Sequence, residues 1–270
     1  MTKNVILVTG ASAGIGRACA DALSTNGWTV IGASRRGVSG SSWRGVEMDV
    51  DDDESVTSCV NRITVEHGQL DAVLACAGWG LAGAAEHTPI ADAKAQFETN
   101  FWGCVRVVHA ALPIMRTHGG GRIVLMSSIG GVIGIPYQSF YSASKFALEG
   151  YAESLAYEVE PFNVKVTLVE PGNFKTDFTS SRRLVTAPET DPYATASTKA
   201  IEVMERDELS GANPLDVAST VLKVLSASRP ARRVSVGKFD ERIGVVAKRL
   251  MPFKLFEASA RSSLGVSKKA

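Results

Sequence analysis

The feature that most constrains the fold is a glycine-rich turn between the first apolar run and the first helical pattern. Residues 3–9 are apolar and β-rich, and Gly10, Gly14 and Gly16 follow before helical periodicity begins at Ala18. Glycines let the backbone approach a pyrophosphate, and a helix N-terminus offers that anion free N–H groups and a positive dipole end. Strand, glycines and helix in this order predict a dinucleotide site, whereas the glycines alone would equally suit a tight turn.

Strand-like and helical segments then alternate along the chain. The further short apolar runs cover residues 28–33, 46–50, 71–75, 122–126, 164–169 and 233–236. Helical patterns separate them over residues 18–23, 51–67, 89–117 (with a break near Gly103), from Tyr141 onward and 214–227. This alternation predicts a Rossmann-like α/β fold, a doubly wound parallel seven-stranded sheet in a single domain over residues 1–270.

Charge and composition argue against several functions. The 270 residues include 29 Lys and Arg and 28 Asp and Glu, and the net charge of +1 does not favour nucleic-acid or membrane-surface binding. The apolar run at residues 5–8 is too short for a signal peptide or a membrane span. The four cysteines form no CxxC pair, which suits a reducing cytoplasm, and the four histidines show no zinc spacing, so no metal is expected.

The end of the second apolar run bears on which dinucleotide binds. Arg35 and Arg36 follow Ser34, and no acidic residue is present there to bind a ribose 2′-hydroxyl as in NAD sites. A guanidinium matches a 2′-phosphate through its planar set of donors, although one of the two arginines is expected to be an ordinary surface residue. The sequence favours NADP(H), with NAD(H) as the alternative.

Tyr141 and Lys145 are four residues apart at the start of a predicted helix, so they share one helical face. A tyrosine has an unperturbed pKa of about 10, and a positive charge close to a phenol favours its ionised form. Such a pair can donate and accept protons near neutral pH. Taken alone, it would equally suit an amphipathic helix start with a lysine reaching toward water.

Three segments are expected to surround the site. The apolar, glycine-rich loop 129–140 follows the carboxyl end of a strand, where ligands bind in open α/β sheets. The long segment 173–213 is expected to be a substrate lid whose phenylalanines meet an apolar substrate. The C-terminal extension 240–270 mixes apolar and basic residues, which suits a membrane-surface helix. Pro252 interrupts it and favours packing over the pocket or against another subunit.

The ordered set of motifs resembles the short-chain dehydrogenase/reductase family over roughly the first two-thirds of the chain. The matching motifs are Thr9-Gly10-x-x-x-Gly14-Ile15-Gly16, Ala75-Cys76-Ala77-Gly78, Asn100, Ser128, Tyr141-x-x-x-Lys145 and Pro171-Gly172-x-x-x-Thr176. Cys76 departs from the family, which more often has Asn there; the turn should survive without one local hydrogen bond. Residues 144–150 also resemble the hydroxysteroid and retinol dehydrogenase branch.

The resemblance implies a role for each matching residue. Tyr141 would be the general acid in ketone reduction, and Lys145 would favour its ionised form and hold the nicotinamide ribose. Ser128, rather than Ser127, would bind the substrate oxygen. Asn100 would complete a water-linked proton relay to Lys145. The residues lining the cofactor would be Gly10, Ser12, Gly14, Ile15, Gly16, Arg35, Asp49, Val50, Ala77, Gly78, Tyr141, Lys145, Pro171, Gly172 and Thr176.

The implied protein is a cytoplasmic, homodimeric or homotetrameric oxidoreductase that uses NADP(H) to interconvert an apolar ketone or aldehyde and its alcohol. A non-catalytic redox regulator is one alternative, and the joint presence of Ser128, Tyr141, Lys145 and Asn100 argues against it. A sugar-nucleotide epimerase or dehydratase is another. That class usually needs a larger substrate domain than the segment after Pro171 provides. The sequence names neither the substrate nor the physiological direction.

Overall fold

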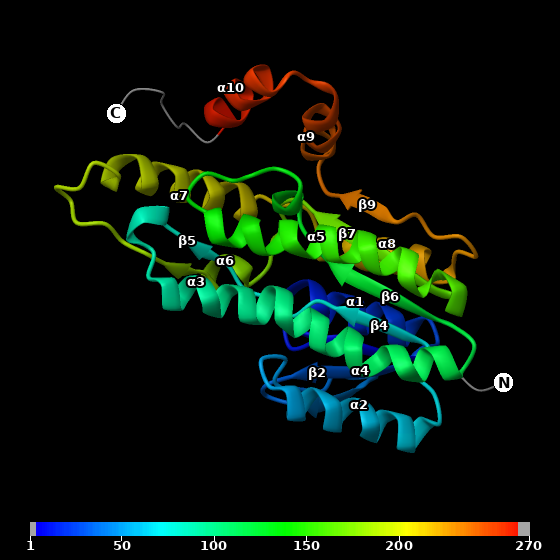
Figure 1. Ribbon diagram of the computed structural model, residues 1–270. Coiled ribbons are helices and arrows are strands. Elements are labelled where there is room, and N and C mark those ends of the chain that lie inside the picture. The colour runs from blue at the N-terminus through cyan, green and yellow to red at the C-terminus, as the bar shows by residue number, and fades with distance from the viewer. Residues whose placement is uncertain (1–3, 264–270) are drawn as a thin grey trace.

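The structure, a computed structural model, describes residues 4–263, and within them seven parallel strands form one sheet (Figure 1). Across the sheet the strands run in the order β3-β2-β1-β4-β6-β7-β9. Their bounds are Val5–Thr9 (β1), Thr29–Ser34 (β2), Arg44–Glu47 (β3), Ala72–Ala75 (β4), Gly121–Met126 (β6), Val164–Pro171 (β7) and Arg233–Val236 (β9). The predicted doubly wound, seven-stranded sheet is confirmed.

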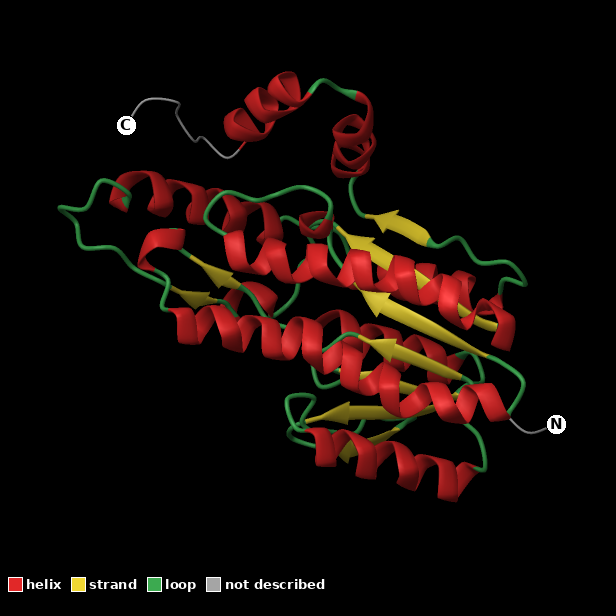
Figure 2. Cartoon of the chain, viewed as in Figure 1, coloured by secondary structure: helices red, strands yellow, loops and turns green. Residues whose placement is uncertain are grey.

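Helices cover both faces of this sheet, as Figure 2 shows. Their bounds are Gly14–Thr25 (α1), Asp53–His67 (α2), Ile90–Phe97 (α3), Gly103–Thr117 (α4), Ser139–Val159 (α5), Phe178–Ser181 (α6), Ala194–Leu209 (α7), Pro214–Ser226 (α8), Phe239–Leu250 (α9) and Phe253–Ser263 (α10). Helices α2, α4 and α5 build one core, which includes Leu7 of β1; α1 and α8 build the other, which includes Ile6. Because both faces of the central strands β1 and β4 are buried, these strands are almost entirely apolar, and that pattern made them recognisable.

The loops that follow the strands meet where the chain changes direction across the sheet. From β1 the chain adds β2 and β3 on one side and then crosses to β4 on the other side of β1. In open α/β sheets a crevice forms outside the carboxyl ends of the strands at such a switch point. The loops after β1, β4, β6 and β7 therefore converge at one edge.

The third strand spans Arg44–Glu47 rather than the predicted residues 46–50. The side chain of Asp49 accepts a hydrogen bond from the N–H of Asp51 at 3.1 Å. An aspartate bonded to the backbone two residues ahead forms a turn. This turn takes Val50 out of the sheet and places it against a helix.

The helical segment 89–117 is interrupted next to Gly103, as predicted. Helix α3 leads through a π-helical turn, Glu98–Trp102, into α4. Gly103 allows close packing, because a Cβ there would lie 2.8 Å from Cγ2 of Val50. Asn100 lies inside the π-turn and is fully buried. Single π-turns within helices are frequent at functional sites.

The segment 173–213 is more regular than expected, since it contains α6, a short strand β8 (Arg183–Leu184) and the long helix α7. Strand β8 pairs with β5 (Leu81–Ala82) in a small second sheet that the sequence did not predict. Helix α7 buries four side chains: Ser197, Ala200, Met204 and Glu208. Two of these four are polar, which weakened the helical pattern.

The C-terminal extension forms the separate helices α9 and α10, which meet at Pro252 and stand above the rest of the molecule in Figure 1. The proline therefore interrupts the extension as predicted. Residues 264–270 of the predicted extension lie outside the described residues. Among residues 4–263, no helix has the length and apolar character needed to cross a bilayer.

Candidate active site

A cleft of about 1480 Å³ opens at the carboxyl ends of the strands. Its walls come from the glycine turn after β1, the loops after β4, β6 and β7, the segment 173–213 and the helices α9 and α10. All 17 residues that the sequence assigns to catalysis or cofactor binding line this cleft. The structure thus brings the whole predicted set together, from segments that are far apart in the sequence.

The glycine turn gives the cleft a backbone surface suited to a phosphate. Gly10 and Gly14 adopt left-handed conformations with φ of +69° and +54°. A Cβ on Gly16 would overlap the carbonyl oxygen of Gly10, and a Cβ on Gly10 would lie 3.0 Å from the backbone N of Ala77. No side chain caps the N-terminus of α1. Its first N–H groups are therefore left for an anion, so the turn fits the pyrophosphate of a dinucleotide.

The loop after β4 is tied to this turn through Thr9. The Thr9 hydroxyl accepts hydrogen bonds from the N–H groups of Cys76 and Ala77, both at 3.0 Å. Burial raises the pKa of the Cys76 thiol to about 12, although the residue is partly exposed, so the thiol is neutral at pH 7. Cys76 thus behaves as a small neutral side chain. The two hydrogen bonds to Thr9 tie down this turn without an asparagine side chain at position 76.

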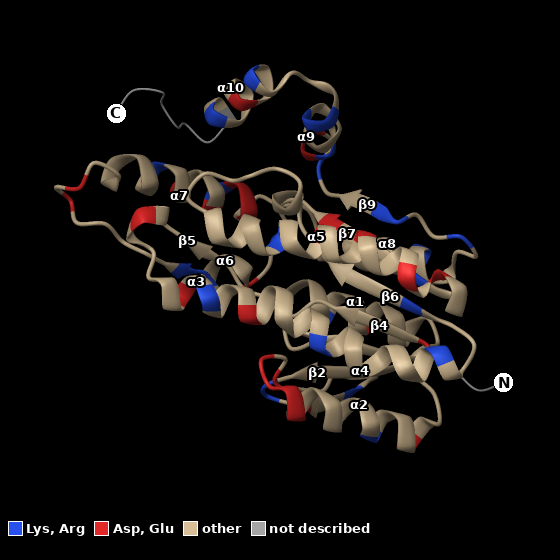
Figure 3. Cartoon of the chain, viewed as in Figure 1, with Lys and Arg blue, Asp and Glu red and all other residues tan. Residues whose placement is uncertain are grey.

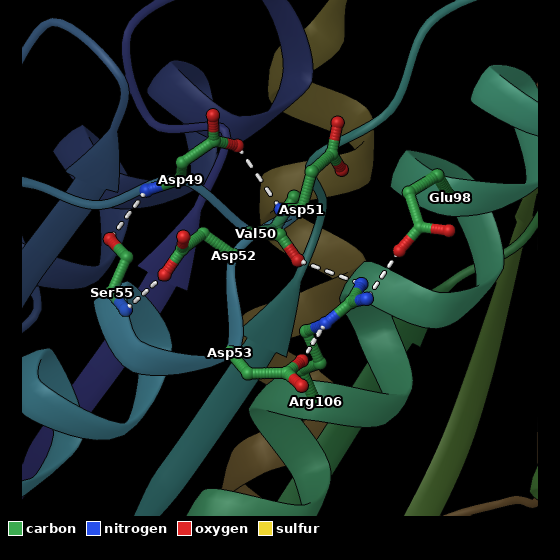
Figure 4. Close-up of polar contacts among 8 residues, drawn as sticks. All are labelled: Asp49, Val50, Asp51, Asp52, Asp53, Ser55, Glu98 and Arg106. Atoms are coloured by element: carbon green, nitrogen blue, oxygen red, sulfur yellow. Dashed lines mark hydrogen bonds and ion pairs between the residues drawn. The ribbon is translucent and has the colours of Figure 1, made fainter.

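The loop after β3, whose polar contacts Figure 4 shows, also lines the cleft. Arg106 of α4 donates hydrogen bonds to the side chains of Asp53 and Glu98 and to the carbonyl oxygen of Val50. One arginine therefore fixes both ends of the segment that includes Asp51. Burial raises the pKa of the Asp51 carboxyl, whereas the Thr99 hydroxyl, which bonds to it at 2.9 Å, and Arg35 act in the opposite direction.

Arg35 and Arg36 are exposed and line the same end of the cleft, directly after β2. Among residues 4–263, neither guanidinium forms an ion pair with a carboxylate within 4.0 Å. Their donors therefore face solvent at the position where a dinucleotide carries its adenosine ribose. The side chain of Asp49, the nearest acid after β3, is engaged by the N–H of Asp51.

The four predicted catalytic side chains converge around two glycines. A Cβ on Gly130 would lie 3.1 Å from Cε1 of Tyr141 and 3.4 Å from Oγ of Ser128. A Cβ on Gly78 would lie 3.0 Å from Oδ1 of Asn100 and 3.8 Å from Nζ of Lys145. Glycine at both positions leaves room for these side chains to share one end of the cleft.

Backbone groups hold the side chains of Lys145 and Asn100. Lys145 Nζ donates to the carbonyl oxygen of Met126 at 2.8 Å and lies 6.0 Å from the centre of the Tyr141 ring. Asn100 accepts from the N–H of Trp79 and donates to the carbonyl oxygen of Trp79, both at 3.0 Å. Paired bonds to one residue fix the orientation of the Asn100 amide. The lysine and the asparagine are buried, so both are pre-positioned before any ligand arrives.

Both Ser127 and Ser128 line the cleft, and the geometry favours Ser128 as the serine beside Tyr141. The hydroxyl of Ser128 accepts from the N–H of Gly130 at 3.0 Å and donates to the carbonyl oxygen of Pro171 at 3.4 Å. Oγ of Ser127 instead lies beside Gly131, close to the buried Glu149. Ser128 therefore bridges the loops after β6 and β7 at the position where Tyr141 reaches the cleft.

Apolar groups form the wall beyond Tyr141. The ring of Phe178 lies 5.8 Å from the ring of Tyr141 in an edge-on arrangement. Ile133, Ile135 and Trp79 complete this wall. The sequence also suggested that the phenylalanines of segment 173–213 would meet a substrate. Phe178 is placed to do so, whereas the neighbouring Phe174 is only 5% exposed and packs mainly in the core beside α8.

Sequence reasoning missed two residues that hold the site. The backbone N–H and carbonyl groups of Trp79 fix the Asn100 amide. Every residue type except proline carries both groups, so the sequence gives no signal for this contact. Glu241 of α9 accepts hydrogen bonds from the N–H of Asn173 at 2.9 Å and from the N–H of Lys238 at 2.8 Å. Its carboxylate fills the space that a Cβ on Gly172 would need. The glutamate three residues after Lys238 was the available signal, as one half of a capping box.

Comparisons with known proteins agree with this geometry. Residues 4–185 match the family model described as short chain dehydrogenase. The chain is 38% identical to 3-ketodihydrosphingosine reductase of Bacteroides thetaiotaomicron over 263 residues, which cover 97% of this chain and 98% of that protein. It is 39% identical to retinol dehydrogenase 8 of Bos taurus over 194 residues, which cover 69% and 62% of the two chains.

A solved structure gives the same result for the fold. The crystal structure of a short-chain dehydrogenase from Streptomyces avermitilis superposes with a TM-score of 0.84 at 31% sequence identity, and the match covers 97% of this chain and 98% of that chain. The family model also spans the glycine turn and the segment of Tyr141 and Lys145. The motifs, the fold and these similarities together show that the chain belongs to the short-chain dehydrogenase/reductase family of oxidoreductases.

Proposed function

We propose that this protein is an NADP(H)-dependent oxidoreductase that interconverts a long-chain apolar ketone and its alcohol. The convergence of Ser128, Tyr141, Lys145 and Asn100 in one cleft carries the proposal, because these groups supply what carbonyl reduction requires of a protein. When bound, the nicotinamide would supply or accept the hydride. The alternatives of a silent redox regulator and of a sugar-nucleotide enzyme do not explain an apolar wall beside this set.

Each of these four side chains has a separate role in the transfer of the proton. Ser128 donates a hydrogen bond to the substrate oxygen and stabilises the negative charge that develops there. Tyr141 gives its phenolic proton to that oxygen, and the positive charge of Lys145 stabilises the phenolate that remains. Asn100, fixed by Trp79, lines the route by which a proton returns to Lys145 and Tyr141. Alcohol oxidation uses the same groups in the opposite direction.

The preference for NADP(H) rests on the exposed guanidinium of Arg35. It lies at the ribose end of the cleft, and a planar set of donors suits a 2′-phosphate. The side chain of Asp49 is engaged within its own loop and does not replace the acid of an NAD site. NAD(H) would bind without this contact.

The substrate class rests on the apolar wall and on the similarity to 3-ketodihydrosphingosine reductase along almost the whole chain. The ring of Phe178 and the isoleucines of loop 129–140 suit an alkyl chain. The carboxylate of Asp177 also lines the cleft, as does that of Asp207, which pairs with Arg206 at 3.0 Å. They suit a ketone that carries an amino group, as a 3-keto sphingoid base does.

We also propose an oligomeric state and a cellular location. Phe146 and Tyr157 of α5 are 44% and 61% exposed, and together with the family membership they support a homodimer or homotetramer. We propose that the segment 173–213 closes over the substrate, because its α6 carries Phe178 and its α7 lines the cleft. The four free cysteines support a cytoplasmic location.

One screen tests the function. The purified enzyme is assayed with NADPH and with NADH against a 3-keto sphingoid base, an unbranched long-chain ketone, a short methyl ketone, retinal and a polar sugar. The proposal expects the highest kcat/KM for the long-chain substrates with NADPH. A preference for the sugar would refute the substrate class, and turnover of none of them would refute the function.

A further inference from the structure

The outer side of α9 is an exposed apolar face. Of the 17 large hydrophobic side chains exposed among residues 4–263, seven lie between Phe239 and Leu255. On α9 they are Phe239, Ile243, Val246 and Leu250, with exposures of 76%, 49%, 55% and 79%. Their spacing places them on one side of the helix. Such a continuous exposed apolar face normally marks an interaction surface.

The opposite side of the same helices already belongs to the cleft. Gly244 of α9 and Phe256, Ser259 and Ala260 of α10 line it, and Val245 is 3% exposed. These inward contacts hold the helix pair in place. The outward stripe is therefore not needed to attach α9 to the sheet and remains available for a partner.

The charge around this stripe is basic, as the helices α9 and α10 in Figure 3 show. Residues 238–261 contain six Lys and Arg and three Asp and Glu, whereas the whole chain has a net charge of only +1. Two of the acids are engaged, Glu241 by backbone N–H groups and Glu257 by Arg261. Arg242 and Arg249 are exposed and flank one side of the apolar stripe.

We infer that α9 and α10 form a docking surface for a lipid bilayer that contains anionic lipid. A helix that lies at a bilayer surface buries an apolar stripe and places arginines among the head groups, and α9 has both features. A second copy of the chain is the competing occupant. Symmetric pairing of two such faces would bring together surfaces on which six Lys and Arg outnumber three Asp and Glu, which is unfavourable.

The surface has a consequence for catalysis, and this step rests on the proposed function. A bilayer on the outer side of α9 would lie about one helix diameter, ~10 Å, from the cleft on its inner side. A long-chain ketone could then enter between the lipid phase and the cleft with little exposure to water. The docking itself does not depend on which substrate is reduced.

Vesicle flotation without substrate or cofactor tests the inference. The protein is mixed with vesicles of phosphatidylcholine alone or of phosphatidylcholine with phosphatidylglycerol. We expect binding to the mixed vesicles, and a loss of at least about tenfold in the F239S/L250S variant. R242E/R249E should lose about tenfold or more on the mixed vesicles only. The matched controls are L209S/L215S, at leucines that are 59% and 57% exposed, and R229E, and both should bind like wild type.

The outcomes separate docking from catalysis. Absence of wild-type binding to both vesicles would overturn the inference, as would equal losses in the controls. Light scattering after size exclusion tests the rival occupant: F239S/L250S should keep the oligomeric state of wild type, and a smaller assembly would assign the face to a second copy.

Both double variants should keep wild-type turnover of a short, soluble ketone. If wild type binds vesicles but reduces no ketone, the proposed function fails and the docking surface stands.

Discussion

The two halves of the cleft are built in different ways. The nucleotide half, residues 4–78, shapes its wall from backbone: the glycine turn fits against Ala77, and Thr9 ties two loops together through N–H groups. The half that we propose binds the substrate, residues 173–263, shapes its wall from side chains on helices, and much of its apolar surface faces out. A backbone-built wall suits a ligand that is the same in every member of a family, whereas a side-chain wall can change with the substrate.

The largest expected effect lies where the halves meet. Replacing Tyr141 by Phe removes the phenolic proton and leaves the ring against Phe178. We expect kcat to fall by about 10³-fold while the Kd for NADPH is unchanged, because general acid–base catalysis contributes roughly 10²–10⁴-fold. Steady-state kinetics and a fluorescence titration measure the two quantities. Turnover above about a tenth of wild type would remove Tyr141 from the acid–base role.

The next effect tests the backbone-built half. In G16A the new Cβ would overlap the carbonyl oxygen of Gly10, so the turn must shift. We expect a loss of about 1–3 kcal/mol in unfolding free energy and weaker NADPH binding. Gly150 in α5 is the matched control, since a Cβ there meets nothing within 4 Å. G150A should be more stable by up to about 1 kcal/mol, because alanine favours a helix. Urea unfolding measures both variants, and equal effects would contradict a specific need for glycine at the turn.

A smaller effect tests the ribose end. R35D removes the proposed phosphate partner and adds a negative charge, so the preference for NADPH over NADH should fall by about ten- to a hundredfold. The ratio of kcat/KM for the two cofactors measures it. R36D is the control, because both arginines are exposed in the same loop. If R36D has the larger effect, Arg36 is the phosphate partner; if neither variant changes the ratio, the NADP(H) proposal is wrong.

The smallest effect tests the side-chain half. F178A removes the ring beside Tyr141 and part of the apolar wall. We expect the KM for a long-chain ketone to rise about tenfold, with no change in the Kd for NADPH. Phe162, 45% exposed and beyond the residues that line the cleft, provides the control F162A. An equal change in cofactor affinity would mean that the two halves do not act independently.

The sequence predicted the nucleotide half well because its requirements are local. A strand, three glycines and a helix follow one another within residues 5–25, and the glycines have left-handed angles or close backbone neighbours in the structure. The residues Ser128, Tyr141 and Lys145 were found because the family keeps their spacing. The end of β3 was predicted wrongly, because the turn at Asp49 depends on a side-chain hydrogen bond that strand propensity does not take into account.

The substrate half was harder because its contacts are long-range. Helix α7 buries Glu208, which pairs with Arg182 on the neighbouring segment. A buried glutamate looks like a solvent-facing residue until its partner is known, so the pattern of α7 was weak. In the same way, nothing near Glu241 in the sequence indicates that its carboxylate would reach Gly172.

The π-turn that holds Asn100 also determines how the following helix, α4, is rotated about its own axis. Its additional residue rotates α4 by about 100° relative to an uninterrupted helix continuing from α3. In this orientation of α4, Arg106 reaches both Asp53 and Glu98. We expect that deleting one residue from Glu98–Trp102 would turn Arg106 away from the loop after β3. The number of residues in this turn therefore matters to the geometry of the cleft as much as the side chains that line it.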